Sequence, residues 1–208
     1  MSERIDTVLE AELSPLGFER ISQRRWVNGI HPPIRSIFEF QARKGDLYAA
    51  RWGFSLDFVP IQRNGRLQWK RTCKSAAFDL CIDPIDQDGS AVRCTVSRFI
   101  FPAKTYDWNR ATHTMKKSAQ LARADYDRVK SVADIVAMFR ERTSMRFRQF
   151  SLESYVQTHI AWGLALLAIG DAGEGERHLR LYCERFSVDR NERKIREAEL
   201  LAKEFSLR

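Results

Sequence analysis

The sequence predicts an α+β protein: an antiparallel meander of five to six strands with an N-terminal helix, followed by a C-terminal helical layer. The first observation is the run over residues 47–60, where the even-numbered residues from Tyr48 onward are apolar and mostly aromatic. A side-chain period of two is typical of a strand with one buried face. The second observation is a change to helical spacing after residue 105. Together they divide the chain into a sheet domain over residues 1–104 and a helical region over residues 105–208 packed on it.

The first half begins with a helix and continues as short strands joined by turns. Ile5, Leu9 and Leu13 form one stripe of a helix expected over residues 3–13, which Pro15 ends. Turns containing Gly and Asn separate the apolar runs that follow, which is the usual pattern of hairpins. The expected strands are residues 25–27, 34–43, 47–60, 67–70, 78–83 and 92–101, with a hairpin turn at Arg63-Asn64-Gly65-Arg66 before the fourth.

The second half follows the helical period. Ser131 is expected to be the N-cap of one helix, whereas residues 108–124 are ambiguous and predict only a short helix near residues 115–121. Ser151 is expected to cap a longer helix that runs to Ile169 and is apolar around most of its circumference. A Gly-Asp turn then leads into a return helix, and a final helix ends the chain.

The positive charge is concentrated in two segments. The net charge is +8, and residues 20–74 alone carry +9, from twelve basic and three acidic residues. Residues 105–150 add +5. Such asymmetry attracts phosphate groups or acidic protein surfaces. No apolar run approaches the ~20 residues that a membrane span needs, and the charged N-terminus lacks an apolar signal region. The sequence therefore predicts a cytoplasmic protein without membrane contact.

The chain shows no motif for a cofactor or a metal ion. Four cysteines without close spacing indicate free thiols in a reducing compartment. His159 and His178 lie on the two helices of the C-terminal hairpin and are able to approach each other, but a satisfied pair of helical histidines is the expected outcome. A loop with Asp86 and Asp88 lacks the carboxylates that a calcium loop needs at its first and twelfth positions. Glycine-rich nucleotide loops and activated nucleophiles are absent, so we expect no cofactor and favour a non-enzymatic role.

One catalytic alternative rests on three residues of the sheet. If residues 67–70 form the hairpin partner of the long strand, then Asp57, Gln68 and Lys70 share its outer face. Metal-dependent nucleases of the PD-(D/E)xK type place an acid on one strand and an (E/Q)xK triplet on the next, where they hold Mg²⁺ and steady the attacking water. The Pro-Asp pair and a second carboxylate are missing here, so this alternative ranks last.

The function that the sequence favours is a binding or interaction module that uses a basic sheet face. Its partner is a protein or a nucleic acid, and the sequence leaves that choice and the oligomeric state open. Alternation predicts that the rings of Trp52 and its aromatic neighbours point into the core, away from any bound bases. The nucleic-acid alternative therefore rests mainly on the positive charge. The predicted binding residues are Arg51, Arg63, Arg66, Lys70, Arg140, Arg142, Arg146 and Arg148. The wider basic set around the sheet includes Arg24, Arg25, Arg35, Arg43, Lys44, Arg71 and Lys74.

Two stretches resemble known families. The segments LSPLGFERISQRRW, FEFQARKG and WGFSLDFV, within residues 13–59, resemble an uncharacterised bacterial domain, the domain-of-unknown-function family four-three-zero-four. That resemblance implies the α+β fold and supplies no catalytic residue. The segment GLALLAIGDAGEGERHLRLYCERF resembles one tetratricopeptide-like helical hairpin. Because repeat arrays need about three units to be stable, we expect a single hairpin packed on the domain.

Overall fold

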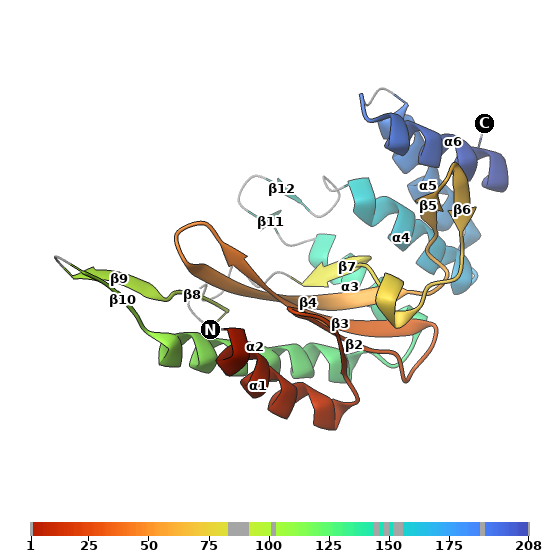
Figure 1. The fold of residues 1–208 in the computed structure, drawn as a ribbon. Coiled ribbons are helices and arrows are strands. Elements are labelled where there is room, and N and C mark those ends of the chain that lie inside the picture. The colour runs from red at the N-terminus through yellow and green to blue at the C-terminus, as the bar shows by residue number, and fades with distance from the viewer. Residues whose placement is uncertain are drawn as a thin grey trace.

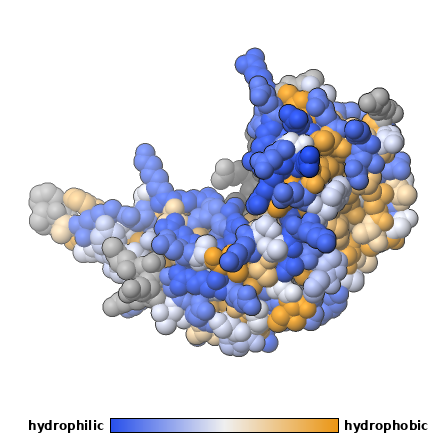
Figure 2. All heavy atoms as spheres, turned by 45° about the vertical axis from the view of Figure 1, so that its right-hand side comes forward, coloured by the Kyte–Doolittle hydropathy of each residue, from blue (hydrophilic) through white to orange (hydrophobic). Residues whose placement is uncertain are grey.

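The predicted α+β architecture is confirmed by a computed structural model. It describes residues 2–82, 92–100, 103–143, 146–147, 150–151, 156–187 and 190–207. A twisted antiparallel sheet forms the centre, α1 and α2 lie side by side under one of its faces, and α4, α5 and α6 stand at one end (Figure 1). The outline is L-shaped, with the sheet as one limb and the C-terminal helices as the other (Figure 2).

The main sheet has the strand order β1-β2-β3-β4-β7, and β8 also pairs with β4. Both β7 and β8 are antiparallel to β4: β7 pairs with its end and β8 with its beginning, so β4 is the central strand. The strand β1 lies outside the strands expected from the sequence. The strands of this sheet are β1 Glu19–Ser22, β2 Arg25–Asn28, β3 Ile34–Arg43, β4 Leu47–Leu56, β7 Leu80–Ile82 and β8 Arg93–Thr95.

The long hairpin of β3 and β4 supplies most of the aromatic core. Its register runs without a break from Ile34 opposite Leu56 to Arg43 opposite Leu47. Alternation along β4 buries every second residue on the face toward α1 and α2, as the sequence predicts. The residues of this inner face with at most 2% exposure are Trp26, Phe38, Phe40, Ala50, Trp52, Phe54 and Leu56.

Two helices cover that inner face. The helix α1, Ser2–Leu13, buries the predicted stripe of Ile5, Leu9 and Leu13, and the short η1, Ser14–Leu16, ends at Gly17 with a φ of 81°. The expected short helix near residues 115–121 is instead α2, Trp108–Arg128, a helix of 21 residues. Its buried stripe consists mostly of small or polar side chains, with Met115 as the one large apolar residue, so the apolar period that marks an amphipathic helix is weak. These residues are Ala111, Thr114, Met115, Ser118, Ala119 and Ala122.

The hairpin expected beside the long strand lies elsewhere. Strands β5, Ile61–Arg63, and β6, Arg66–Gln68, form a separate two-stranded sheet, so the predicted pairing of residues 67–70 with the long strand is wrong. The turn itself is confirmed, with positive φ at Asn64 and Gly65. This hairpin packs against the C-terminal helices, where Trp69 meets the ring of Phe205 edge-on.

A two-stranded arm follows β8. The single strand expected over residues 92–101 is divided between β8 and β9, Ser97–Ile100, which pairs with β10, Ala103–Tyr106. The arm projects beyond the end of the main sheet, at the left of Figure 1. Since every described side chain of β10 is exposed, and most of β9, the arm contributes little to the core.

The C-terminal layer contains an αα-hairpin and two flanking helices. Ser131 caps α3 as predicted, through its hydroxyl and the Asp134 N–H. Ser151 lies in the small β12 and α4 begins at Val156, so the prediction that Ser151 is the N-cap of that helix is wrong. The remaining elements are α3 Val132–Thr143, β11 Arg146–Phe147, β12 Phe150–Ser151, α4 Val156–Ala168, α5 Ala172–Phe186 and α6 Glu192–Phe205.

Most of the buried apolar residues belong to one large core, to which the sheet, α1, α2 and the C-terminal helices all contribute. Because α2 packs on β3, β4 and β8, the helical region that begins at residue 105 contributes its first helix to the sheet layer. The predicted division at residue 104 stays a prediction. Among the described residues, no helix is both long and apolar enough to cross a membrane.

Candidate functional site

The outer face of the sheet, which points away from α1 and α2, carries ordered rows of charged side chains. Strand register fixes which residues stand next to one another on neighbouring strands. The first row is Arg25, Glu39 and Arg51, the second is Gln41, Ala49 and Arg93, and the third is Arg43, Leu47 and Thr95. Four arginines and one acid therefore share this face, which we call the basic face.

The single acid of the basic face is shared by two arginines. Glu39 accepts a hydrogen bond of 2.8 Å from Nε of Arg25 and one of 2.5 Å from Nη2 of Arg51. Both guanidinium groups also lie over the ring of Phe78, at 5.7 and 4.8 Å. Burial by itself raises the pKa of Glu39, but the hydrogen bond from Arg25 and the charges of both arginines outweigh it. The pKa is therefore lowered, the carboxylate stays ionised, and the row keeps one excess positive charge.

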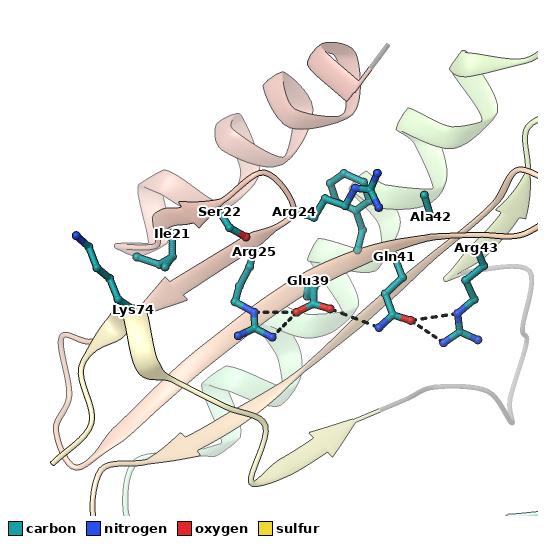
Figure 3. Close-up of a pocket in the computed structure, with 10 residues that line it drawn as sticks. Ile21, Ser22, Arg24, Arg25, Glu39, Gln41, Ala42, Arg43 and Lys74 are labelled. Atoms are coloured by element: carbon teal, nitrogen blue, oxygen red, sulfur yellow. Dashed lines mark hydrogen bonds and ion pairs between the residues drawn. The ribbon is translucent and has the colours of Figure 1, made fainter. Parts of the chain in front are cut away.

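A shallow groove of about 650 Å³ runs along this face. Figure 3 shows Lys74 at one end, Arg43 at the other, and a chain of hydrogen bonds from Arg25 through Glu39 and Gln41 to Arg43 between them. The carboxamide oxygen of Gln41 accepts two of these bonds from Arg43, from Nε at 3.1 Å and Nη2 at 2.8 Å. The lining residues are Ile21, Ser22, Arg24, Arg25, Glu39, Phe40, Gln41, Ala42, Arg43 and Lys74.

The groove has more positive than negative charge. Within the described residues, Arg24, Arg43 and Lys74 take part in no ion pair, and Arg24 rests over the ring of Phe40 at 5.8 Å. Local structure fixes their places: Arg24 stands in the β1–β2 turn, Arg43 ends β3, and Lys74 belongs to η2, Cys73–Ser75. A capping box of Thr72 and Ser75 closes that short helix. Among the described residues these three cations are exposed and have no acid partner. Lys74 and Arg43 lie at the two ends of the groove, whereas Arg24 extends over Phe40 toward the inner face (Figure 3).

Two ion pairs beside the groove are structural. Arg35 binds both carboxylate oxygens of Asp57, at 2.6 and 2.9 Å. Arg71 donates to the buried Asp79 at 2.7 Å, and the same oxygen accepts the Leu56 N–H at 2.7 Å. Burial raises the pKa of Asp79 to about 7, against the opposing charge of Arg71 and the hydrogen bond from Leu56. Arg35 and Arg71 are therefore occupied within the fold.

The three residues of the nuclease alternative do not stand on paired strands. Asp57 follows β4 and its carboxylate is held by Arg35, whereas Gln68 ends β6 in the separate hairpin and Lys70 follows it. Within the described part of the chain, no group of three or more His, Cys, Asp or Glu side chains is arranged to hold a metal ion. No contact in the structure therefore supports that alternative.

The predicted binding residues are scattered. Arg51 lies on the basic face, Arg63 and Arg66 are exposed on the β5–β6 hairpin, and Lys70 is exposed beyond it. The remaining four belong to the segment at the end of α3. Arg140 pairs with Asp171 at 3.4 Å, Arg142 lies in the last turn of the helix, and Arg146 lies in β11. Arg148 is outside the described residues, as are Asp86 and Asp88.

The groove is instead built from cations of the wider basic set. The sequence already names Arg24, Arg25, Arg43 and Lys74 as neighbours of the aromatic sheet. Arg93 is absent from both predicted sets, although its strand lies within the expected residues 92–101 and Val92 and Cys94 on either side of it are buried. Alternation about those two residues is the signal that places Arg93 on the outer face.

A second polar site is enclosed between α4 and α5. The Nδ1 atoms of His159 and His178 are 2.9 Å apart, which confirms that the two rings meet, and Trp162 packs over His178 at 4.0 Å. Arg177, which only donates, lies 3.2 Å from Nε2 of His178. In the neutral pair His178 therefore carries its proton on Nδ1 and donates it to His159. Burial, the neighbouring His159 and the charge of Arg177 lower the pKa of His178 to about 4.

The chain has no significant match among protein-family models, curated protein sequences or solved structures. The resemblances of residues 13–59 and of the helical hairpin to known families stay predictions.

Proposed function

We propose that this protein is a non-enzymatic binding protein that holds an anionic macromolecule on its basic face. The observation that carries the proposal is the groove, where Arg43 and Lys74 have no acid partner among the described residues while Glu39 is shared by two arginines. Ion pairs within the fold satisfy most of the other arginines of the sheet. Unpaired cations gathered in one hollow supply a local positive potential that attracts anions.

The hydrogen-bonded floor of the groove favours recognition over chemistry. Glu39 is fixed as an ionised acceptor between two arginines, so it is a poor general base. Arg43 is oriented by Gln41, and an arginine whose fork is already oriented loses less entropy when it binds a carboxylate or a phosphate. The site therefore suits an anion that binds and leaves unchanged.

A matched pair of charge reversals tests the proposal. The double variant Arg43→Glu with Lys74→Glu changes the groove, and Arg185→Glu with Lys203→Glu makes the same change in net charge on exposed positions of α5 and α6. Immobilised heparin serves as the polyanion, and the elution salt concentration is the measurement. We expect the groove variant to elute at much lower salt than the parent and the control to elute close to the parent. Equal shifts in both variants would show that net charge, and not the groove, retains the protein.

A further inference from the structure

The exposed arm of β9 and β10 stands beside the arginine end of the groove. Arg43 pairs with Leu47, and Leu47 pairs with Thr95, two residues before the arm begins. Two strand spacings, about 10 Å, therefore separate Arg43 from the base of the arm. An ion pair of 2.5 Å between Lys104 and Asp46 ties β10 to the turn that follows Arg43. The base of the arm therefore lies close to the arginine end of the groove.

The arm displays aromatic rings with cations around them. Ser97 pairs with Tyr106 and Phe99 with Lys104, so these four side chains share one face of the ribbon. Phe99 is 70% exposed and makes no ring contact within the described part of the chain. Tyr106 is 45% exposed and stacks on Trp108 with an angle of 10° between the rings. Ile100, its neighbour in the chain, is also exposed, at 54%, so the arm presents two large apolar side chains that the fold does not cover.

Among the described residues, the two acids near the arm already have partners. Asp46 pairs with Lys104, and Asp107 accepts the Arg110 N–H as the N-cap of α2. Arg98 and Arg93 are exposed on the arm and on the strand that leads into it. Flat rings beside cations match a ligand that offers π-faces and negative charges in alternation. Single-stranded nucleic acid has that chemistry, since its bases stack on aromatic side chains while its phosphates meet arginine and lysine.

We propose that the anionic partner is single-stranded nucleic acid, with its phosphates on Arg43 and the other groove cations and a base stacked on Phe99. This inference rests on the proposed function, because the groove supplies the electrostatic part of the binding. An acidic protein would use the same cations but gains little from an isolated phenyl ring next to Lys104 and Arg98. A duplex keeps its bases stacked inside and leaves Phe99 unused.

The test measures fluorescence anisotropy of a labelled oligo-dT of about 15 nucleotides, which covers a typical single-strand site. Competitors are a duplex of the same length, heparin and a poly-glutamate peptide. The variants are Arg43→Gln, Phe99→Ala and Phe99→Trp, with Leu181→Ala as the control for loss of an exposed apolar side chain on α5. Thermal melting confirms that each variant is folded, which is expected at positions this exposed.

The inference predicts that Phe99→Ala weakens oligo-dT binding about 5-fold or more while Phe99→Trp preserves it. It also predicts that Arg43→Gln weakens binding of every polyanion and that Leu181→Ala changes nothing. Oligo-dT binding that depends on Arg43 but not on Phe99 would overturn the inference and leave the proposed function intact. Preference for the duplex or for poly-glutamate would overturn it in the same way. If no polyanion bound through Arg43, both the inference and the proposed function would fall.

Discussion

At the scale of single residues, Gly53 is a position of the sheet where no other residue type fits without strain. It lies in the middle of β4 with a φ of 154°, opposite Cys81 of β7. A Cβ built there stands 2.0 Å from the carbonyl oxygen of Leu80, which is backbone and has no room to move. We expect Gly53→Ala to lower the free energy of unfolding by more than about 2 kcal/mol, measured by urea denaturation.

The control for that substitution is Gly45→Ala in the β3–β4 turn. Gly45 also has a positive φ, 80°, but a Cβ there meets no atom within 4 Å. Only the left-handed backbone is then penalised, at about 1 kcal/mol. Equal losses at Gly45 and Gly53 would show that backbone conformation, and not the approach of β7, makes glycine necessary in β4.

The buried His178 makes stability depend on pH. Its pKa in the folded protein is about 4, below the ordinary 6.5, because of burial, His159 and Arg177, with Glu174 opposing them. A depressed pKa means that the unfolded chain binds the proton first, so stability is present above pH 6.5 and is lost as the pH falls toward 4. The shift is equivalent to a loss of up to about 3 kcal/mol.

His178→Phe should remove this dependence, since a phenyl ring keeps the packing against Trp162 without a proton to bind. The measurement is the urea midpoint at several pH values from about 7 to 4. His113→Gln, on the exposed side of α2, is the matched control and should keep the slope of the parent. If His178→Phe kept the full change of the urea midpoint with pH, the pH dependence would come from the carboxylates and not from His178.

At the scale of elements, the close crossing of α4 and α5 depends on two glycines. A Cβ on Gly163 meets the Gly175 carbonyl oxygen at 2.9 Å and the Leu179 side chain at 3.0 Å. Gly163→Ala should therefore push the helices apart and cost about 1–3 kcal/mol. Gly173→Ala, in the first turn of α5 with nothing within 4 Å, should be neutral or stabilising by up to about 1 kcal/mol. Thermal melting of both variants checks the prediction, and a stabilised Gly163→Ala would contradict it.

The elements that the sequence predicts well are those with a strong local period. The β3 strand has the predicted bounds, and the inward rings of β4 follow from alternation alone. The length of α2 was not predictable from apolar spacing, because alanine, threonine and serine fill most of its buried stripe. The pairing of β4 with β7 instead of β6 is a long-range choice, set by packing of the β5–β6 hairpin against α6. Local patterns carry no information about that choice.

In the candidate site, too, the local features are predictable from the sequence and the long-range contacts are not. The sequence locates the basic segment and the outward direction of Arg51, which are local properties. Which cations remain without an acid depends on partners far apart in the chain. Arg35 pairs with Asp57 and Arg71 with Asp79, whereas the hydrogen-bond partner of Arg43 among the described residues is the neutral Gln41. Counting charges along the chain therefore predicts a basic surface but not its groove.

At the scale of the whole molecule, α2 joins the sheet to the helical layer. Tyr126 donates to the Ile37 carbonyl oxygen at 2.8 Å and packs edge-on against Phe54, and the indole N–H of Trp52 donates to Asp125 at 2.8 Å. A chain cut at residue 104 loses these partners and uncovers the inner face of β3 and β4. Exposing three large aromatic side chains forfeits about 5 kcal/mol or more, which is comparable to the whole stability of a small domain, about 5–15 kcal/mol.

We therefore expect the fragment of residues 1–104 not to fold by itself and the full chain to unfold in one transition. Far-ultraviolet circular dichroism and tryptophan fluorescence of the full chain should give coincident urea curves, because the sheet, α2 and the C-terminal helices share one core. The fragment should bind a hydrophobic dye and show a poorly dispersed amide spectrum. A fragment that unfolds cooperatively would mean that α1 alone covers enough of the aromatic face, and the predicted boundary at residue 104 would then separate two independent folding units.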